Sequence, residues 1–403
     1  MSTMSSDRVS SADDGSLTTI PFLTEGLRPF FLAAGLWAVV ALSIWVAFLQ
    51  GYITIPSRFD PLSWHIHEML FGFVMAAVAG FLLTAIPNWT RRLPVSGSPL
   101  AWLAGLWLAG RLASFFSQAL PFWLAVAADL AFPLALAAVV AREIIGARNR
   151  RNMPMIAPVL ILSAADLLMH LEAHGFGVER GLGWRLALAA ILVLVSVIGG
   201  RIIPSFTHNW LVARGAVQFP QGHGYVDSLA LGTLHAGLFL WAIQPGSPLA
   251  GGLLILAGLV NGWRLSCWHG GKTLSEPLLF MLHIGYGWLC AGAVLLGAAV
   301  LHDAVPVDAG IHSMTVGVIG IMILAVMTRA SRGHTGRELS ADRATGLIYA
   351  FALLAAIVRT GAAFLPQWTT LLLMASAGLW IAGFGTFVIF YGPVLMAPRL
   401  RRP

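Results

Sequence analysis

The chain has 403 residues, of which 58% are hydrophobic and only 10% are charged, with a formal net charge of +7. A soluble domain carries about 25% charged residues, so this composition excludes an ordinary soluble protein and indicates a polytopic membrane protein. The basic residues are scattered singly between apolar runs, which argues against nucleic-acid binding and favours a role in topology. The two cysteines form no metal-binding or haem-attachment motif, so any haem would be held non-covalently.

The apolar stretches predict an all-α membrane domain of about 12 transmembrane helices, because a helix needs about 20 apolar residues to cross the bilayer. We expect a disordered cytoplasmic tail over 1–28, a single membrane domain over 29–393 and a basic cytoplasmic tail over 394–403. The expected spans are 29–50, 66–88, 98–118, 120–142, 154–174, 184–205, 226–244, 247–267, 277–301, 310–331, 343–364 and 368–393.

The arginines give an independent test of this number of spans. With both termini in the cytoplasm of a bacterium and the chain in its inner membrane, the cytoplasmic loops carry most of the basic residues. The loop with Asp303 and Asp308 would then lie outside. The basic residues assigned to the cytoplasm are Arg91, Arg92, Arg142, Arg148, Arg150, Arg151, Arg214, Lys272, Arg332, Arg337, Arg343, Arg399, Arg401 and Arg402.

A weak internal repeat relates spans that are four helices apart. Residues 67–72 and 312–317 both fit the pattern His-x-Met-x-x-Gly, each at the outer end of an inward-running helix. Residues 86–90 and 203–207 also resemble each other, since each reads Ile-Pro followed by two residues that differ and then Thr. These pairs suggest three units of four helices about a pseudo-threefold axis.

Twelve histidines in a chain this poor in charge are candidates for metal or haem ligands, because ionisable groups in a bilayer are costly. His65 and His67 are two positions apart and point to different sides of a helix, so they cannot serve one metal together. His170 and His174 are four apart and share a face, which permits two ligands to one metal. The alternative is that histidines at helix ends merely place polar tips among lipid headgroups.

Other charged groups within the spans are expected to have partners. Arg111 and Asp129 flank a tight hairpin at similar depth and predict an ion pair. Arg359 and Asp166 lie in the outer halves of their helices and predict a second pair. Glu68 could orient an imidazole or relay protons, or could simply be a carboxylate at a helix start.

The motifs resemble the NnrS family over nearly the whole chain. The matching segments are 64–73, 80–90, 200–207, 282–286 and 312–337. The resemblance implies haem b, with copper as a second metal, in a protein tied to nitric oxide, nitrosative stress and denitrification. The helix number and repeat are also similar to the haem–copper oxidase catalytic subunit, as a fold analogy only. His235 stands alone on the seventh span, where such an oxidase would place paired histidines, so an oxidase-like copper site is in doubt.

We combine these indications into one set of expected sites. His67 and His312 should face a common interior, with at least one of them bound to haem iron. His208 occupies a variable position of the family pattern and receives no role. The expected cofactor ligands are His65, His67, His312, His283 and His170, the expected metal ligands are His174, His235 and His334, and the side chains expected to support them are Glu68, Tyr286, Arg329 and Arg337.

The sequence leaves three functions open. The preferred one is a haem protein that binds or processes nitric oxide, with nitric oxide and an electron donor as partners and lipid around it. One alternative is a secondary transporter of a metal or an anion with a histidine-lined site. The other is a non-catalytic haem-based nitric oxide sensor. Whether the protein is an oxidoreductase is not determined by the sequence.

Overall fold

The computed structural model describes residues 20–222 and 224–400, and its regular structure is helical throughout this part of the chain. Most of the expected N-terminal tail and the last three residues lie outside the described residues. Within the expected tail, however, Pro21–Leu23 forms a short 3₁₀ helix and α1 already begins at Leu27. Helix α14 likewise extends into the expected C-terminal tail, to Met396.

Helices occupy all twelve expected spans. Within residues 20–222 and 224–400, eleven are long and apolar enough to cross a membrane, and α4 fills the remaining position beside α5. The prediction of an all-α integral membrane fold is therefore confirmed. The α-helices are α1 (Leu27–Leu49), α2 (Pro61–His67), α3 (Met75–Thr90), α4 (Ser98–Phe115), α5 (Phe122–Gly146), α6 (Ile156–Ala173), α7 (Leu182–Val212), α8 (Gly224–Ile243), α9 (Pro248–Ser266), α10 (Pro277–Leu301), α11 (Val307–His312), α12 (Ile321–His334), α13 (Arg343–Ala362) and α14 (Thr369–Met396).

The second and tenth spans are each interrupted by a π-helical segment. Glu68–Val74 connects α2 to α3, and Ser313–Gly320 connects α11 to α12. Each segment begins directly after the histidine of the His-x-Met-x-x-Gly motif. The sequence repeat thus corresponds to the same local deviation from α-helix, a deviation that occurs often at functional sites.

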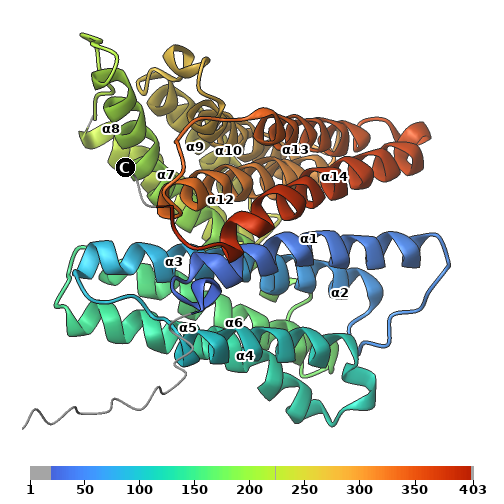
Figure 1. The fold of residues 1–403 in the computed structure, drawn as a ribbon. Helices are drawn as coiled ribbons and strands as arrows, with labels where there is room; N and C mark the ends of the chain where they lie inside the picture. The colour runs from blue at the N-terminus through green and yellow to red at the C-terminus, as the bar shows by residue number, and fades with distance from the viewer. Residues whose placement is uncertain (1–19, 223, 401–403) are drawn as a thin grey trace, which may run out of the picture.

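The helices pack as a closed ring of three four-helix units. Helices α1 to α5 form the first unit, α6 to α9 the second, and α10 to α14 the third, and the units meet where α5 packs on α6, α9 on α10 and α14 on α1. In Figure 1, α3 to α6 lie in the lower half, and α8 to α10 together with α12 to α14 lie in the upper half. This arrangement agrees with the pseudo-threefold expected from the repeat.

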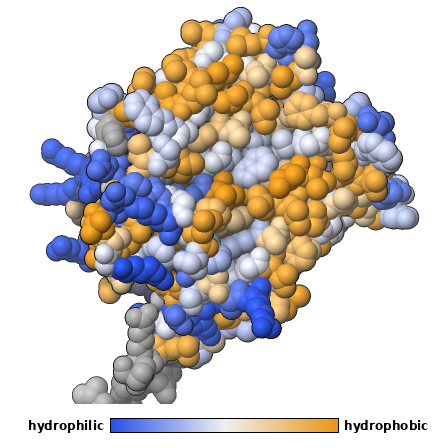
Figure 2. All heavy atoms as spheres, turned by 90° about the horizontal axis from the view of Figure 1, so that it is seen from above, coloured by the Kyte–Doolittle hydropathy of each residue, from blue (hydrophilic) through white to orange (hydrophobic). Residues whose placement is uncertain are grey.

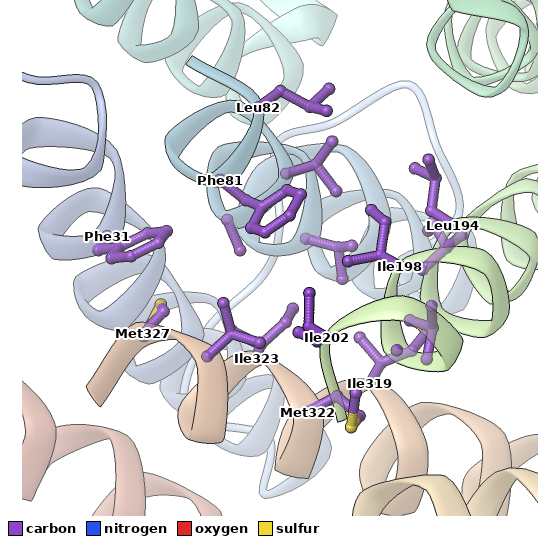
Figure 3. Close-up of a pocket in the computed structure, with 17 residues that line it drawn as sticks. Phe31, Phe81, Leu82, Leu194, Ile198, Ile202, Ile319, Met322, Ile323 and Met327 are labelled. Carbon is purple, nitrogen blue, oxygen red and sulfur yellow. The ribbon is translucent and has the colours of Figure 1, made fainter. Parts of the chain in front are cut away.

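The second, sixth and tenth spans meet at the centre of this ring. A cavity of about 80 Å³ lies between them, and its lining is apolar. Figure 3 shows Phe81 and Leu82 of α3, Ile198 and Ile202 of α7, and Ile323 of α12 converging on it. Large β-branched and aromatic side chains therefore surround the axis of the bundle.

The outer surface shows the polarity expected of an integral membrane protein. In Figure 2, hydrophilic atoms gather mainly at the left end, with fewer at the right end, and a broad hydrophobic region lies between them. Many leucine and tryptophan side chains are exposed on helices, among them Trp102, Leu124 and Leu259. Apolar surface of this extent is stable only against lipid.

Candidate functional site

Six ionisable side chains are buried together near the start of the second span. None of them is more than 6% exposed. They come from five segments, namely α2, the π segment that follows it, α4, α5 and α6. Such a cluster is costly in an apolar interior unless its charges compensate each other. Its members are His67, Glu68, Arg111, Asp129, Asp166 and His170.

The imidazole of His67 lies at the centre of the cluster. Its Nε2 is 2.9 Å from Oδ1 of Asp166 and 3.1 Å from Oδ2 of Asp129. Its Nδ1 is 3.1 Å from Oε1 of Glu68. Glu68 therefore occupies the position of a carboxylate that orients an imidazole, which is one of the two roles considered from the sequence.

Arg111 joins two carboxylates of the cluster. Its guanidinium donates to Asp129 and, over 2.9 Å, to Oε2 of Glu68. The predicted Arg111–Asp129 ion pair is thus confirmed and has Glu68 as a third member. The predicted Arg359–Asp166 pair is wrong. Among the described residues Asp166 contacts histidines, because α6 packs its carboxylate toward α2 and α5, whereas Arg359 lines a different cavity.

His170 completes the cluster from α6. Its Nε2 lies 3.1 Å from Oδ2 of Asp129 and 3.8 Å from Oδ1 of Asp166, which is one turn earlier on the same helix. The spacing of His170 and His174 permitted them to bind one metal together, but His170 contacts Asp129 and Asp166 instead. His174 is exposed and stacks on Phe122 with ring centroids 3.9 Å apart. The ligand atoms of His67, Asp129, Asp166 and His170 all lie within 4.8 Å of one another.

The π segment and a glycine position Glu68. The indole Nε1 of Trp37 on α1 donates to Oε2 of Glu68 over 2.8 Å. Trp37 can approach because Gly72 has no side chain; a Cβ there would lie 2.3 Å from the indole nitrogen. The matching glycine of the other motif, Gly317, receives the ring of Trp288 from α10 in the same way. The two motifs therefore share a packing role.

A separate cavity of about 370 Å³ lies between the second and tenth spans and contains both His65 and His312. Its walls are mainly apolar and come from α1, α2, α7, α11, α13, α14 and the two π segments. The volume is in the range of small-molecule pockets. Among the described residues, the acidic and basic side chains that line it besides the two histidines are Asp308 and Arg359.

Both histidines of this cavity have nitrogen atoms available for a ligand. Nδ1 of His312 donates to the backbone carbonyl of Asp308 over 2.9 Å, so the lone pair lies on Nε2. Nδ1 of His65 is buried without a hydrogen-bond partner, and its ring stacks on Trp45 with centroids 4.7 Å apart. The structure thus brings His65 together with His312, while His67 belongs to the charged cluster. The expectation that His67 and His312 face a common interior is corrected accordingly.

His283, His235 and Tyr286 lie in the second and third units. Nε2 of His283 is 2.9 Å from the hydroxyl of Thr207, and its Nδ1 is buried without a partner beside a groove of about 570 Å³. Nε2 of His235 is 2.9 Å from the hydroxyl of Ser196. The hydroxyl of Tyr286 accepts a hydrogen bond from Nη1 of Arg264 over 2.7 Å and donates one to Oδ1 of Asn261 over 2.8 Å. These three side chains do not join either of the sites above.

The remaining predicted residues lie at the opposite end of the tenth span. Nδ1 of His334 is 3.1 Å from Oε2 of Glu25. The guanidinium of Arg329 lies 4.3 Å from the ring centroid of Phe206, and Nη1 of Arg337 is buried without a partner. Among the described residues, no hydrogen bond, ion pair or ring contact of these three side chains involves His283.

One signal in the sequence could have revealed the cluster. Asp166 and His170 have the i, i+4 spacing of two ligands on one helix face, but His170 and His174 have the same spacing, so the spacing alone does not select the pair. The sequence around Trp37 did not indicate its role in the cluster, because its contact with Glu68 depends on how α1 packs on the π segment.

Comparison with known proteins agrees with this description. No curated protein matches the chain. A family model described as "NnrS protein" matches residues 21–399, which is nearly the whole sequence. The chain therefore belongs to the NnrS family, as its motifs predict.

Proposed function

We propose that this integral membrane protein binds haem b in the cavity between His65 and His312 and acts in the nitric oxide response. Family membership fits a membrane protein of that response. The single observation that carries the haem proposal is the placement of two histidines from equivalent spans in one apolar cavity. Haem bound there would supply an iron atom able to bind nitric oxide.

The donor atoms of the cavity suit haem. A histidine that ligates iron usually donates its other ring nitrogen to a carbonyl or carboxylate, as Nδ1 of His312 does to Asp308. The unpaired Nδ1 of His65 is a buried polar atom that lacks a partner. Arg359 provides a positive charge for a carboxylate of the ligand. His312, through its Nε2, and His65 are therefore the residues that would hold the haem in this cavity.

Nitric oxide can reach this cavity through apolar parts of the protein. It is a small neutral molecule that dissolves in lipid. The central cavity of Figure 3 is lined by apolar side chains, and two of them, Val74 and Ile319, also line the cavity that holds His65 and His312. Reduction of nitric oxide would additionally need an electron donor, which we propose as a further partner. Copper at any of the remaining histidines is a separate proposal.

The pyridine haemochrome spectrum of the purified protein tests this function. We expect a haem b signal and a shift of the Soret band when nitric oxide is added to the reduced protein. His312→Ala should remove or shift the band, and His65→Ala should change it while the protein still inserts in the membrane. His302→Ala, at the C-cap of α10 and outside the lining of the cavity, is the control and should keep the spectrum.

The outcome also separates the alternatives. A purified protein without any haem contradicts the proposal and favours a histidine-lined transporter. Haem that binds nitric oxide but gives no turnover with any donor favours the sensor.

A further inference from the structure

The charged cluster contains a complete set of metal ligands. Two imidazole nitrogens, from His67 and His170, and two carboxylate oxygens, from Asp129 and Asp166, lie within 4.8 Å of one another. We propose that these four side chains bind one divalent metal ion, Zn²⁺, in a closed tetrahedral site. Imidazole and carboxylate together suit zinc, which takes four such ligands in structural sites. This site is distinct from the haem cavity, and its proposal does not depend on haem.

The distances between the ligand atoms fit such an ion. Zinc bonds of about 2.0–2.2 Å place tetrahedral ligands about 3.3–3.6 Å apart. The nitrogen–oxygen distances from His67 are 2.9 and 3.1 Å, and those from His170 are 3.1 and 3.8 Å. These values lie on both sides of the tetrahedral separation. A shift of a few tenths of an ångström would bring these four separations to the tetrahedral value, and all six separations lie within 4.8 Å.

The charge of the cluster also calls for a divalent cation. Glu68, Asp129 and Asp166 contribute three negative charges when ionised, and Arg111 contributes one positive charge. With neutral imidazoles the buried cluster thus carries two negative charges, and these groups are at most 2% exposed. An uncompensated charge is expensive inside an apolar bundle. One Zn²⁺ would make the cluster neutral.

Neighbouring groups hold the ligands as they do around zinc sites in general. Glu68 contacts Nδ1 of His67, which directs Nε2 toward the proposed metal. Arg111 holds Oδ1 of Asp129, which leaves Oδ2 for the metal. Oδ2 of Asp166 is completely buried and has no hydrogen-bond partner among the described residues. A buried carboxylate with one unpaired oxygen is uncommon, and a cation bound at its Oδ1 would compensate its charge.

The position of the site in the fold indicates a structural role. All four coordination positions are filled by the protein, so no position remains open for a substrate. The ligands connect α2 to α5 and α6, and α5 packs on α6 where the first four-helix unit meets the second. The metal would therefore fix the junction between two units and the short helix that also carries His65.

Metal analysis of the purified protein tests the proposal. We expect about one equivalent of zinc per chain after expression with added Zn²⁺ and washing with a chelator, measured by mass spectrometry. Asp166→Asn and His170→Ala should each lose most of it. The matched control is His174→Ala, one turn further along α6, which should keep the metal because this ring stacks on Phe122 outside the cluster.

A second measurement and defined contrary outcomes keep the test decisive. X-ray absorption of the zinc-loaded wild type should show nitrogen and oxygen neighbours near 2.0–2.1 Å, including imidazole. A folded wild type without stoichiometric metal overturns the proposal and implies that two protonated histidines neutralise the cluster. Zinc that is retained by both Asp166→Asn and His170→Ala, or lost equally by His174→Ala, also overturns it.

Discussion

Nε2 of His67 lies 2.9 Å from Oδ1 of Asp166, a carboxylate that is 99 positions further along the chain. Two residues before His67, His65 enters the separate cavity that also contains His312. The short helix α2 therefore supplies one histidine to each of two sites. The helical turn of about 100° per residue makes this possible, because side chains two residues apart point to different sides of the helix.

The orientation of the chain in the membrane can be tested with reporter fusions. We expect a reporter at the C-terminus, or one inserted near Arg150, to report cytoplasm, because the basic loops are retained there. A reporter inserted in the loop between Asp303 and Asp308 should report periplasm. The opposite result at any of these positions would contradict the assigned orientation.

Replacement of Arg111 should destabilise the protein strongly. Arg111→Leu leaves Glu68 and Asp129 without their cation in a buried site, which costs about 3–5 kcal/mol. The double variant Arg111→Leu with Asp129→Leu should recover only part of this, because Glu68 loses its guanidinium partner and keeps only Trp37 and His67. The measurement is the thermal stability of the detergent-solubilised protein.

Arg142→Leu serves as the control for loss of an arginine. Its side chain is 64% exposed, so its pair with Glu143 should contribute only about 0–1 kcal/mol. Complete recovery of thermal stability in the double variant would show that the burial of the Glu68 carboxylate does not require Arg111.

The motif glycines should not tolerate alanine. In Gly72→Ala the new methyl group would lie 2.3 Å from Nε1 of Trp37, and in Gly317→Ala it would lie 2.7 Å from the ring of Trp288. We expect a loss of about 1–3 kcal/mol for each, as for other overpacked positions, measured by thermal unfolding in detergent.

Gly105→Ala and Gly232→Ala are matched controls within helices. Nothing lies within 4 Å of a Cβ built at either position. These variants should be neutral or should gain up to about 1 kcal/mol, because alanine favours a helix more than glycine does. Equal changes in thermal stability in all four glycine variants would refute a packing role specific to the motif glycines.

Arg359 should contribute to haem retention if the cavity holds haem. Arg359→Gln removes the positive charge beside His65 and His312, and we expect a several-fold lower haem-to-protein ratio after purification. Arg329→Gln is the control, because Arg329 packs on Phe206 and does not line this cavity. An unchanged ratio in Arg359→Gln would show that haem needs no cation there.

The two π segments show that a sequence motif can be recognised without indicating the backbone conformation that it adopts. The repeat at 67–72 and 312–317 identified equivalent spans, and the structure gives both the same π turn and the same glycine–tryptophan contact. The motif did not indicate the π turn, and it did not indicate the contacts of its glycines with Trp37 and Trp288, because those indoles come from other helices. The Arg111–Asp129 pair was predictable because a tight hairpin fixes the relative depth of α4 and α5.

The sequence by itself determined the membrane class, the helix positions and the family, because the length of apolar runs and local motifs are properties of neighbouring residues. Only the tertiary structure decided which side chains meet. The rotation of each helix about its axis depends on packing against several others, and a rotation of one residue moves a side chain by about 100°. For this reason His67 was expected beside His312 but lies beside Asp166, and His65 takes its place in the cavity.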